Sequence, residues 1–208
     1  MKVLIACEYS GRVRNAFQAL GHDAWSCDLL PAEDQSQKHL QCDVTGILGD
    51  GWDLMIAHPE CTYLCSSGLH WNKRGAVVNG RPRSELTEES LDFVRLLMNA
   101  PIPRIAIENP IGCISTRIRK PDQIIQPYEY GEDASKATCL WLKNLPKLQP
   151  IGRLQGRQVL YNGKLVERWA NQTDSGQNRL GPSEDRWKER ARTYQGWANA
   201  MAAQWGCS

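Results

Sequence analysis

Short apolar runs, each followed at once by polar residues, constrain the fold of this chain more than any other feature. Residues 2–7, 52–57 and 104–107 form three such runs, with little alternation between apolar and polar positions. Runs of this kind are typical of strands buried on both faces, as in a parallel sheet covered by helices. We therefore expect an α/β fold with a mostly parallel central sheet and helices on both faces.

The segments between these runs carry helix and loop signals. A helix is expected between Gly11 and Gly21, followed by a strand over residues 23–27, and a longer helix should be capped by Thr87 and ended by Pro101. We interpret the remaining segments as a loop at 31–40, a long mobile loop at 72–84, an edge strand at 136–142, a loop at 146–157 and mostly helix at 182–205.

Composition favours one domain over residues 1–208. The chain has 208 residues, 41% of them hydrophobic, which is enough for a sizeable core. We expect residues 1–115 to hold the cofactor and catalytic motifs, and residues 116–208 to form a substrate-side and closing helical region. No run approaches the ~18 apolar residues of a membrane span, and the first residues enter a strand, so we expect a cytoplasmic protein without membrane contact. The eight cysteines lack paired spacing, which favours free thiols.

Charge is unevenly distributed along the chain. The formal net charge is +2, but residues 151–208 hold nine Lys or Arg against five Asp or Glu. The same segment contains Trp169, Trp187, Trp197 and Trp205. Basic and aromatic residues together suit phosphate contact and base stacking, although a solvated helix face with core aromatics explains them equally well.

Two of the apolar runs deliver reactive side chains. Cys61 follows the run at 52–57, and Glu108 follows the run at 104–107. The carboxyl ends of parallel strands meet at one edge of a sheet, so we expect the thiol and the carboxyl group to face one pocket. This pair suits attack of a thiolate on an electron-poor ring, with the acid serving the ring nitrogen that receives charge.

The first strand, turn and helix suggest a cofactor site. Asp28 follows Glu8 by 20 residues, the spacing at which dinucleotide-type folds place an acid for a ribose. Only Gly11 is available to let a pyrophosphate approach the backbone, which weakens the case for a dinucleotide. S-adenosylmethionine has no phosphate, and Asp28 and Asp43 are plausible for its ribose and adenine. Both acids are also ordinary turn residues.

Four segments carry a resemblance to a known family. Residues 8–11 (EYSG), 58–61 (HPEC), 108–110 (ENP) and 196–200 (GWANA) resemble, in order, motifs of the carbon-5 cytosine-specific DNA methyltransferases. The resemblance extends to small phage and prophage members of that family, which lack a large target-recognition domain. The resemblance implies a Rossmann-like methyltransferase fold that uses S-adenosylmethionine. For a phage-encoded protein, the location would be the host cytoplasm.

The resemblance also implies roles for individual residues. Cys61 would add to ring carbon 6, Glu108 would bind ring nitrogen 3, and carbon 5 would accept the methyl group. Cofactor contacts are expected from Glu8, Ser10, Gly11, Asp28, Asp43 and Asn199. Contacts to a DNA or pyrimidine nucleotide substrate are expected from Lys73, Arg74, Arg81, Arg83, Lys136 and Thr138.

Departures from the family pattern keep alternatives open. Glu60 precedes the cysteine, and an unpaired carboxylate there would raise the thiol pKa unless a cation such as Arg104 or Lys136 neutralised it. A catalytically degenerate binding protein, or an enzyme acting on RNA or a free pyrimidine nucleotide, would also fit the motifs. We also weighed a cysteine hydrolase and a metal site formed by His58, Cys61, Cys65 and His70.

Overall fold

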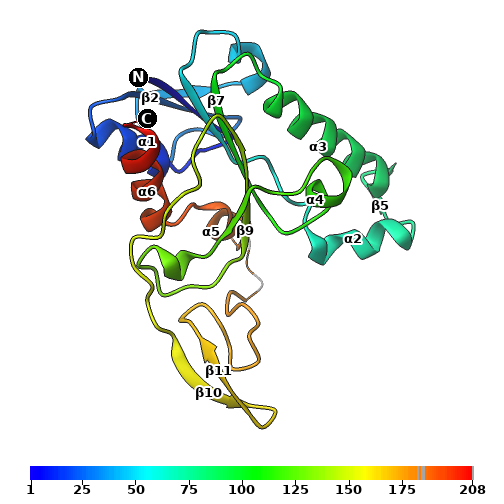
Figure 1. Cartoon of the computed structure of the whole chain (residues 1–208). Helices are drawn as coiled ribbons and strands as arrows, with labels where there is room; N and C mark the ends of the chain where they lie inside the picture. The colour runs from blue at the N-terminus through cyan, green and yellow to red at the C-terminus, as the bar shows by residue number, and fades with distance from the viewer. Residues whose placement is uncertain (182, 184–185, 208) are drawn as a thin grey trace.

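The computed structural model describes residues 1–181, 183 and 186–207, without the side chains of Arg186 and Trp187. Its centre is a seven-stranded sheet in the order β3-β2-β1-β4-β7-β9-β8 (Figure 1). The strands are β1 (Lys2–Ala6), β2 (Asp23–Asp28), β3 (His39–Gln41), β4 (Leu54–Ala57), β7 (Arg104–Pro110), β8 (Gln123–Ile125) and β9 (Thr138–Lys143). Strands β3, β2, β1, β4 and β7 pair in parallel, whereas β9 runs antiparallel to both β7 and β8. The expected mostly parallel sheet is confirmed.

Helices cover both faces of the sheet, as expected. One face carries α1 (Arg12–Ala19) and α6 (Gln195–Trp205), and the other carries α3 (Arg83–Met98) and α4 (Ile114–Arg117). In β1, Val3 and Ile5 belong to the core under α1 and α6, whereas Leu4 and Ala6 belong to the core under α3. Because successive side chains of a strand point to opposite faces, a strand between two helical layers is apolar throughout.

Smaller elements surround this core. They are η1 (Val44–Ile47), α2 (Ser66–Lys73), β5 (Val77–Val78), β6 (Arg81–Pro82), η2 (Pro127–Glu129), β10 (Arg157–Tyr161), β11 (Lys164–Arg168) and α5 (Arg186–Ala191). Strands β10 and β11 form a hairpin that projects away from the sheet (Figure 1). Across the described residues, no helix is both long and apolar enough to cross a bilayer.

Two expectations about the middle of the chain are wrong. Residues 72–84 are not one loop, because they contain the end of α2, the β5–β6 hairpin and the start of α3. Helix α3 begins at Arg83 after Pro82, one turn before the expected cap. Thr87 lies inside the helix, where its hydroxyl accepts a hydrogen bond from Asn72 at 2.9 Å. The tertiary contact replaces the capping role that the local pattern suggested.

The second half of the sheet also departs from expectation. Strand β9 is an interior strand, because β8 pairs with its outer side. Residues 138–141 are fully buried, which is typical of an interior strand, but the three residues of β8 are too few for a clear pattern. The β10–β11 hairpin was also missed, although its turn residues Asn162 and Gly163, both with positive φ, are a known hairpin signal. The described part of 182–205 is mostly helical, as expected.

Candidate active site

The carboxyl ends of the parallel strands form the edge at which this fold binds ligands. The strand order reverses between β1 and β4, because β2 and β3 lie on one side of β1 while β4 and β7 lie on the other. Ligands of open α/β sheets bind in the crevice outside such a switch point. Because β9 is antiparallel to β7, its first residue, Thr138, pairs with the last residue of β7, Pro110. The start of β9 therefore reaches the same edge.

Cys61 lies in a tight turn that follows β4. Its carbonyl oxygen accepts hydrogen bonds from the backbone N–H groups of Leu64 and Cys65, each at 3.0 Å. The loop after β7 packs closely against this turn at Gly112, where a Cβ atom would lie 2.0 Å from the Leu64 carbonyl oxygen. Only glycine permits this approach, so the loops after β4 and β7 are held together.

Two buried side chains anchor the same turn. Arg83 donates a hydrogen bond to the carbonyl oxygen of Thr62 at 2.6 Å, and its side chain also contacts the Tyr63 ring. Asn109, in β7, donates from Nδ2 to the carbonyl oxygen of Pro59 at 2.7 Å. Arg83, which we expected to contact substrate, therefore has a positioning role in this structure.

Cys61 and Cys65 form a pair of thiols within one turn. Cys65 is the N-cap residue of α2, and its Sγ lies 3.0 Å from Ser67 Oγ. Interaction with Cys61, followed by interactions with Ser67 and Gly68, lowers the pKa of Cys65 to about 5 against the opposing effect of burial. Interaction with Cys65, and then burial, raise the pKa of Cys61. A helix N-terminus also favours negative charge at Cys65.

Glu108 faces this thiol pair from β7. Its Oε2 lies 3.0 Å from Nδ1 of His58, and both side chains are nearly buried. Burial raises the pKa of the Glu108 carboxyl, but the His58 hydrogen bond, the charge of Lys136 and a hydrogen bond from Thr138 outweigh it, so the pKa is lowered. Lys136 and Glu108 also act electrostatically on Cys61. The structure thus brings together Cys61, Glu108, Lys136 and Thr138.

Three buried polar atoms in this cluster have no hydrogen-bond partner among the described residues. They are His58 Nε2, Glu108 Oε1 and Asn109 Oδ1, and the fourth such atom, Trp197 Nε1, belongs to α6. Buried polar atoms are nearly always paired, since an unpaired one costs about 1–3 kcal/mol. The cluster is therefore suited to a ligand that offers hydrogen-bonding groups.

Glu60 is not placed to raise the pKa of the Cys61 thiol as expected. Its side chain is exposed, and its Oε1 accepts a hydrogen bond from Thr62 Oγ1 at 2.6 Å. After Cys65, the charged side chains that act on Cys61 are Lys136 and Glu108, and Glu60 is not among them. Arg104, considered as a neutralising cation, begins β7 at the opposite end from Glu108, so that assignment is wrong.

On the other side of the switch point, Glu8 follows β1 and caps α1. Its Oε1 accepts the backbone N–H of Val13 at 2.7 Å, and its Oε2 accepts that of Arg14 at 3.2 Å. Ser10 Oγ donates to Oε1 at 3.4 Å. Burial raises the pKa of Glu8, and the charge of His58 and the backbone hydrogen bonds oppose that rise only in part. Glu8 therefore interacts electrostatically with His58 across the edge, while its two carboxylate oxygens bind backbone N–H groups of α1.

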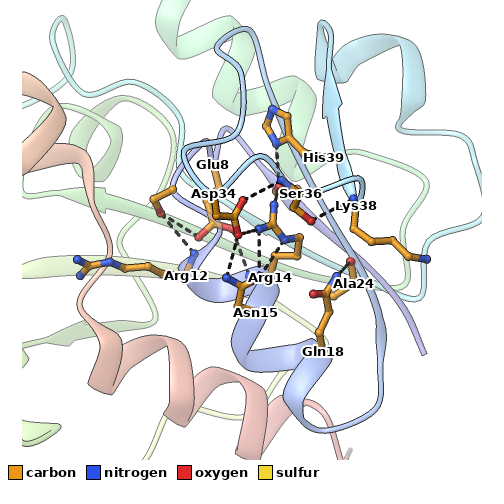
Figure 2. Close-up of polar contacts among 12 residues, drawn as sticks. Glu8, Arg12, Arg14, Asn15, Gln18, Ala24, Asp34, Ser36, Lys38 and His39 are labelled. Atoms are coloured by element: carbon orange, nitrogen blue, oxygen red, sulfur yellow. Dashed lines mark hydrogen bonds and ion pairs between the residues drawn. The ribbon is translucent and has the colours of Figure 1, made fainter.

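Gly11 is required by a buried ion pair. It is the N-cap of α1, with φ of 70°, and a Cβ atom there would lie 2.3 Å from the Arg14 guanidinium. Arg14 is fully buried, pairs with Asp34, and donates to Ser26 Oγ at 2.7 Å. Ser26 Oγ in turn lies 2.8 Å from Nδ1 of His39. This network (Figure 2) ties the polar segment after β2 to α1.

Asp28 and Asp43 lie at the carboxyl ends of β2 and β3, on one side of the end of β1. Asp28 ends β2, is partly buried and accepts the Leu30 N–H at 2.9 Å, and burial raises the pKa of its carboxyl. Asp43 is exposed and caps η1 by accepting the Thr45 N–H at 2.9 Å. Burial, with the charges of both acids, raises the pKa of Cys7 to about 12. Both predicted acids therefore lie beside the crevice.

Asn199 lies on an exposed face of α6. Its Oδ1 accepts a hydrogen bond from Gln195 of the same helix at 2.9 Å. Helix α6 packs on α1 through neighbouring small residues, Ala198 and Ala202. This side-chain hydrogen bond of Asn199 thus stays within its own helix.

The predicted basic residues of the 72–84 segment are separate from the thiol cluster, apart from Arg83. Lys73 and Arg74 are exposed at the end of α2, where Arg74 lies 5.3 Å from the centroid of the Trp71 ring. Arg81 is exposed and pairs with Glu89 of α3. Lys73 and Arg74 are therefore the two exposed members of this group whose charged ends have no carboxylate partner among the described residues.

Helix α5 crosses the strand-end edge. The Tyr9 hydroxyl donates to the carbonyl oxygen of Lys188, and Lys136 Nζ donates to that of Arg190, each at 3.1 Å. Tyr9 follows β1 and Lys136 precedes β9, so α5 spans both halves of the edge.

The tryptophans of the basic segment are mostly core residues. Trp197 and Trp205 are fully buried under the sheet, and Trp169 stacks on Tyr128 with ring centroids 4.1 Å apart. The side chain of Trp187 lies outside the described residues. For the three described tryptophans, the core interpretation is confirmed and base stacking is not available.

Sequence reasoning missed the roles of His58 and Asn109. His58 was considered only as a metal ligand or hydrolase base, yet it binds Glu108, 50 residues away. Asn109 fixes the turn of Cys61 from the neighbouring strand. The available signal was their position next to Cys61 and Glu108 at strand ends. Among the described residues, no group of three His, Cys, Asp or Glu side chains is placed to hold a metal ion.

Comparisons with known proteins add little to this description. No protein-family model matches the chain, and no curated protein does. Among the solved structures, the chain is similar to a candidate DNA modification methyltransferase encoded within a prophage of E. coli. The match has 15% sequence identity and a TM-score of 0.41, and covers 67% of this chain but only 45% of the neighbour. At these values the likeness carries no argument about activity.

Proposed function

We propose that this chain is an S-adenosylmethionine-dependent methyltransferase that modifies carbon 5 of cytosine in DNA. The observation that carries the proposal is that the Cys61 thiol and Glu108, with its unpartnered Oε1, follow the paired strands β4 and β7 at one carboxyl edge of the sheet and interact electrostatically. A nucleophilic sulfur and a carboxyl group in one pocket suit addition to an electron-poor ring. The resemblance of residues 58–61 and 108–110 to methyltransferase motifs supports the same assignment.

Each residue of the cluster has a role in this reaction. Cys61 Sγ adds to ring carbon 6, and the electron pair displaced from the ring double bond makes carbon 5 nucleophilic. Glu108 binds the ring edge that carries nitrogen 3 and the amine, while His58 holds the other carboxylate oxygen. Lys136 stabilises negative charge in the pocket. Loss of the carbon-5 proton to solvent, after methylation, expels the thiolate of Cys61.

The residues beside the switch point fit S-adenosylmethionine better than a nucleotide with a pyrophosphate. Phosphates bind helix N-termini through free N–H groups, but Glu8 already occupies two such groups of α1 with a carboxylate. A carboxylate there repels phosphate and tolerates a sulfonium cation. Asp28 supplies the acid for ribose hydroxyls. When bound, S-adenosylmethionine supplies the electrophilic methyl group.

A nucleic-acid substrate is supported by the region beside Lys136. Ser135, the preceding residue, donates its backbone N–H to Asn171 Oδ1 at 2.9 Å, and its carbonyl oxygen accepts a hydrogen bond from Asn171 Nδ2 at 3.0 Å. Asn171 follows the β10–β11 hairpin. Residues 151–181 around this hairpin hold five Lys or Arg and two Asp or Glu. Excess positive charge favours contact with phosphates, and Lys73 and Arg74 add exposed cations.

Trapping of a covalent adduct tests this proposal. Duplex DNA containing 5-fluorocytosine, incubated with S-adenosylmethionine, should become covalently attached to Cys61, because fluorine cannot leave as a cation as the carbon-5 proton does. Cys61→Ser should form no adduct while still binding the cofactor in calorimetry. Asp28→Ala should weaken cofactor binding without removing the thiol.

Repeating the experiment with other substrates distinguishes the proposed DNA methyltransferase from the alternative functions. Fluorinated RNA or a fluorinated cytidine monophosphate, trapped in place of DNA, would move the proposal to those substrates. Cofactor binding without any adduct would indicate a degenerate binding protein. A folded protein that binds neither S-adenosylmethionine nor its demethylated product would refute the methyltransferase assignment.

A further inference from the structure

The β10–β11 hairpin carries a pair of exposed leucines next to its turn. Leu160 and Leu165 lie directly opposite each other on the two strands, and their exposed fractions are 74% and 68%. A single exposed leucine is common on a protein surface, but an exposed pair on a projecting hairpin (Figure 1) forms one apolar surface. The described part of the chain leaves this surface uncovered.

The base of the hairpin is held by stacked side chains. Trp169, directly after β11, stacks on Tyr128 of η2 with ring centroids 4.1 Å apart. The Arg153 guanidinium lies over both rings, 5.0 Å from the centroid of Tyr128 and 5.7 Å from that of Trp169. These contacts fix the base against η2, and the leucine pair lies at the far end of the ribbon.

The same base is joined to the segment that enters the candidate active site. The Ala170 N–H donates to Asp133 Oδ1 at 2.9 Å, and Asn171 exchanges two hydrogen bonds with the backbone of Ser135. Lys136 follows directly and acts electrostatically on Glu108. A partner bound by the hairpin is therefore held beside the pocket.

The charges of this region favour an anionic partner. The two acids of residues 151–181, Glu167 and Asp174, are paired with Arg153 and Arg157. Three further cations of the segment have no carboxylate partner among the described residues, and they are Lys164, Arg168 and Arg179. A second copy of the chain would bring the same positive charge to the hairpin. Duplex DNA is therefore a better match for this surface.

We propose that the β10–β11 hairpin enters the minor groove of duplex DNA, where Leu160 and Leu165 insert between neighbouring base pairs and bend the duplex. Two-stranded ribbons bind DNA in either groove. Leucine offers no hydrogen bond to a base edge, but apolar side chains in the minor groove can unstack a base step. The last two cross-strand pairs of the ribbon span about 7 Å, close to the groove depth of about 7.5 Å.

The insertion has a use in the reaction. The inference rests on the proposed function, which takes duplex DNA as the substrate. A stacked cytosine cannot reach a thiol inside a pocket, so the base must leave the helix first. Unstacking a nearby step lowers the cost of that movement. Lys164, exposed at the turn, contacts a phosphate at the edge of the groove.

Bending and unstacking of DNA test the leucine pair directly. Energy transfer between dyes at the two ends of a duplex reports the bend, and the fluorescence of 2-aminopurine within it reports unstacking. Wild-type protein should increase both signals. The double variant Leu160→Thr/Leu165→Thr keeps residues suited to strands and should lose both signals and bind about tenfold more weakly. Ile124→Thr, at an exposed position of β8, is the matched control and should match the wild type.

The salt dependence of binding tests the phosphate contact. Lys164→Ala should make the slope of affinity against salt concentration shallower by about one unit, because one fewer phosphate is neutralised. Lys120→Ala removes an exposed cation before β8 and should leave the slope unchanged. An unchanged slope in Lys164→Ala would contradict the placement of the turn at the groove edge.

Two results would overturn the inference outright. The first is wild-type protein that binds duplex DNA without bending it, or a double variant that bends it equally well. The second comes from sedimentation without DNA. If the wild type self-associates and the double variant is monomeric, the leucines belong to an interface between copies of the chain.

Adduct trapping distinguishes this inference from the proposed function. Single-stranded DNA containing 5-fluorocytosine needs little unstacking, so the double variant should form the Cys61 adduct on it at the wild-type rate. On duplex DNA the same variant should be about tenfold slower, in line with its weaker binding. Absence of any adduct in the wild type would refute the proposed function. Bending by the wild type and not by the double variant would still support insertion of the leucines.

Discussion

The two halves of the strand-end edge treat their buried polar groups differently. Near β1, Glu8 caps α1 with both oxygens, and Arg14 is paired with Asp34 and Ser26. Near β4 and β7, atoms of His58, Glu108 and Asn109 have no hydrogen-bond partner among the described residues. The first half uses its polar groups to build structure, whereas the second leaves them available.

Both halves of the edge carry acids and cations, but this difference assigns one half to stability and the other to function. A buried charge with every bond satisfied holds its surroundings in place, and its loss destabilises the fold. A buried polar group with an unpaired hydrogen-bonding atom lowers the stability of the fold. Groups of this kind occur mostly at functional sites. Substitutions in the two halves should therefore produce opposite kinds of defect.

The largest stability effect is expected in the first half. Arg14→Met removes a fully buried guanidinium, so that Asp34 loses its ion pair and Ser26 loses one of its hydrogen bonds. We expect the free energy of unfolding to fall by about 3–5 kcal/mol, measured by urea denaturation. Arg12→Met on the same helix loses one bond to the Thr193 carbonyl oxygen and serves as the control, with a loss of about 1 kcal/mol. Equal losses in both variants would contradict the comparison.

The second prediction concerns activity in the other half. Glu108→Gln keeps the shape of the side chain but removes the carboxylate that would serve the ring. Adduct formation should slow by about 10²–10⁴-fold, while the free energy of unfolding changes by less than about 1 kcal/mol. Glu8→Gln is the comparison, because it should cost about 1 kcal/mol of stability through the weakened cap and slow adduct formation much less than Glu108→Gln does. A slow Glu8→Gln variant with a normal Glu108→Gln would reverse the assignment.

The two glutamates should also differ in the sign of their pH dependence. The pKa of Glu8 is raised in the folded protein, so its ionisation destabilises the fold as the pH rises above about 4.5. The pKa of Glu108 is lowered, so its contribution is present above about 4.5 and is lost as the pH falls. From pH 4 to 7, the stability of wild type relative to Glu8→Gln should fall, and that relative to Glu108→Gln should rise. If both stability differences changed with pH in the same direction, this prediction would be refuted.

The smallest effects are expected at the exposed cations. Lys73→Ala should change the free energy of unfolding by less than about 0.5 kcal/mol and should make the salt dependence of DNA binding shallower by about one unit of slope. Arg81→Ala is the control, because its guanidinium already pairs with Glu89. The same slope change in both variants, or none in Lys73→Ala, would remove this segment from the DNA contact.

Much of the sheet could be predicted from local pattern, and much of the site could not. The runs that became β1, β4 and β7 are apolar because both faces are covered, and this is visible in the residues themselves. Strand β9 is interior only because β8 pairs with it, and the three residues of β8 are too few to show a strand pattern in the sequence. Arg83 was assigned to substrate because its neighbours are polar, yet it bonds to the Thr62 carbonyl oxygen, 21 residues away.

The sequence by itself determined that a thiol and a carboxyl group end neighbouring buried strands. Apolar runs and the helices between them are local properties, and parallel pairing then brings Cys61 and Glu108 to one edge. Only the tertiary structure decided which polar atoms are satisfied. That His58 bonds to Glu108 and that Glu60 faces solvent both depend on how loops pack after the strands have paired. The hydrogen bond between His58 and Glu108 joins residues 50 positions apart. It produces no periodic pattern in the sequence, because it depends on distance in space.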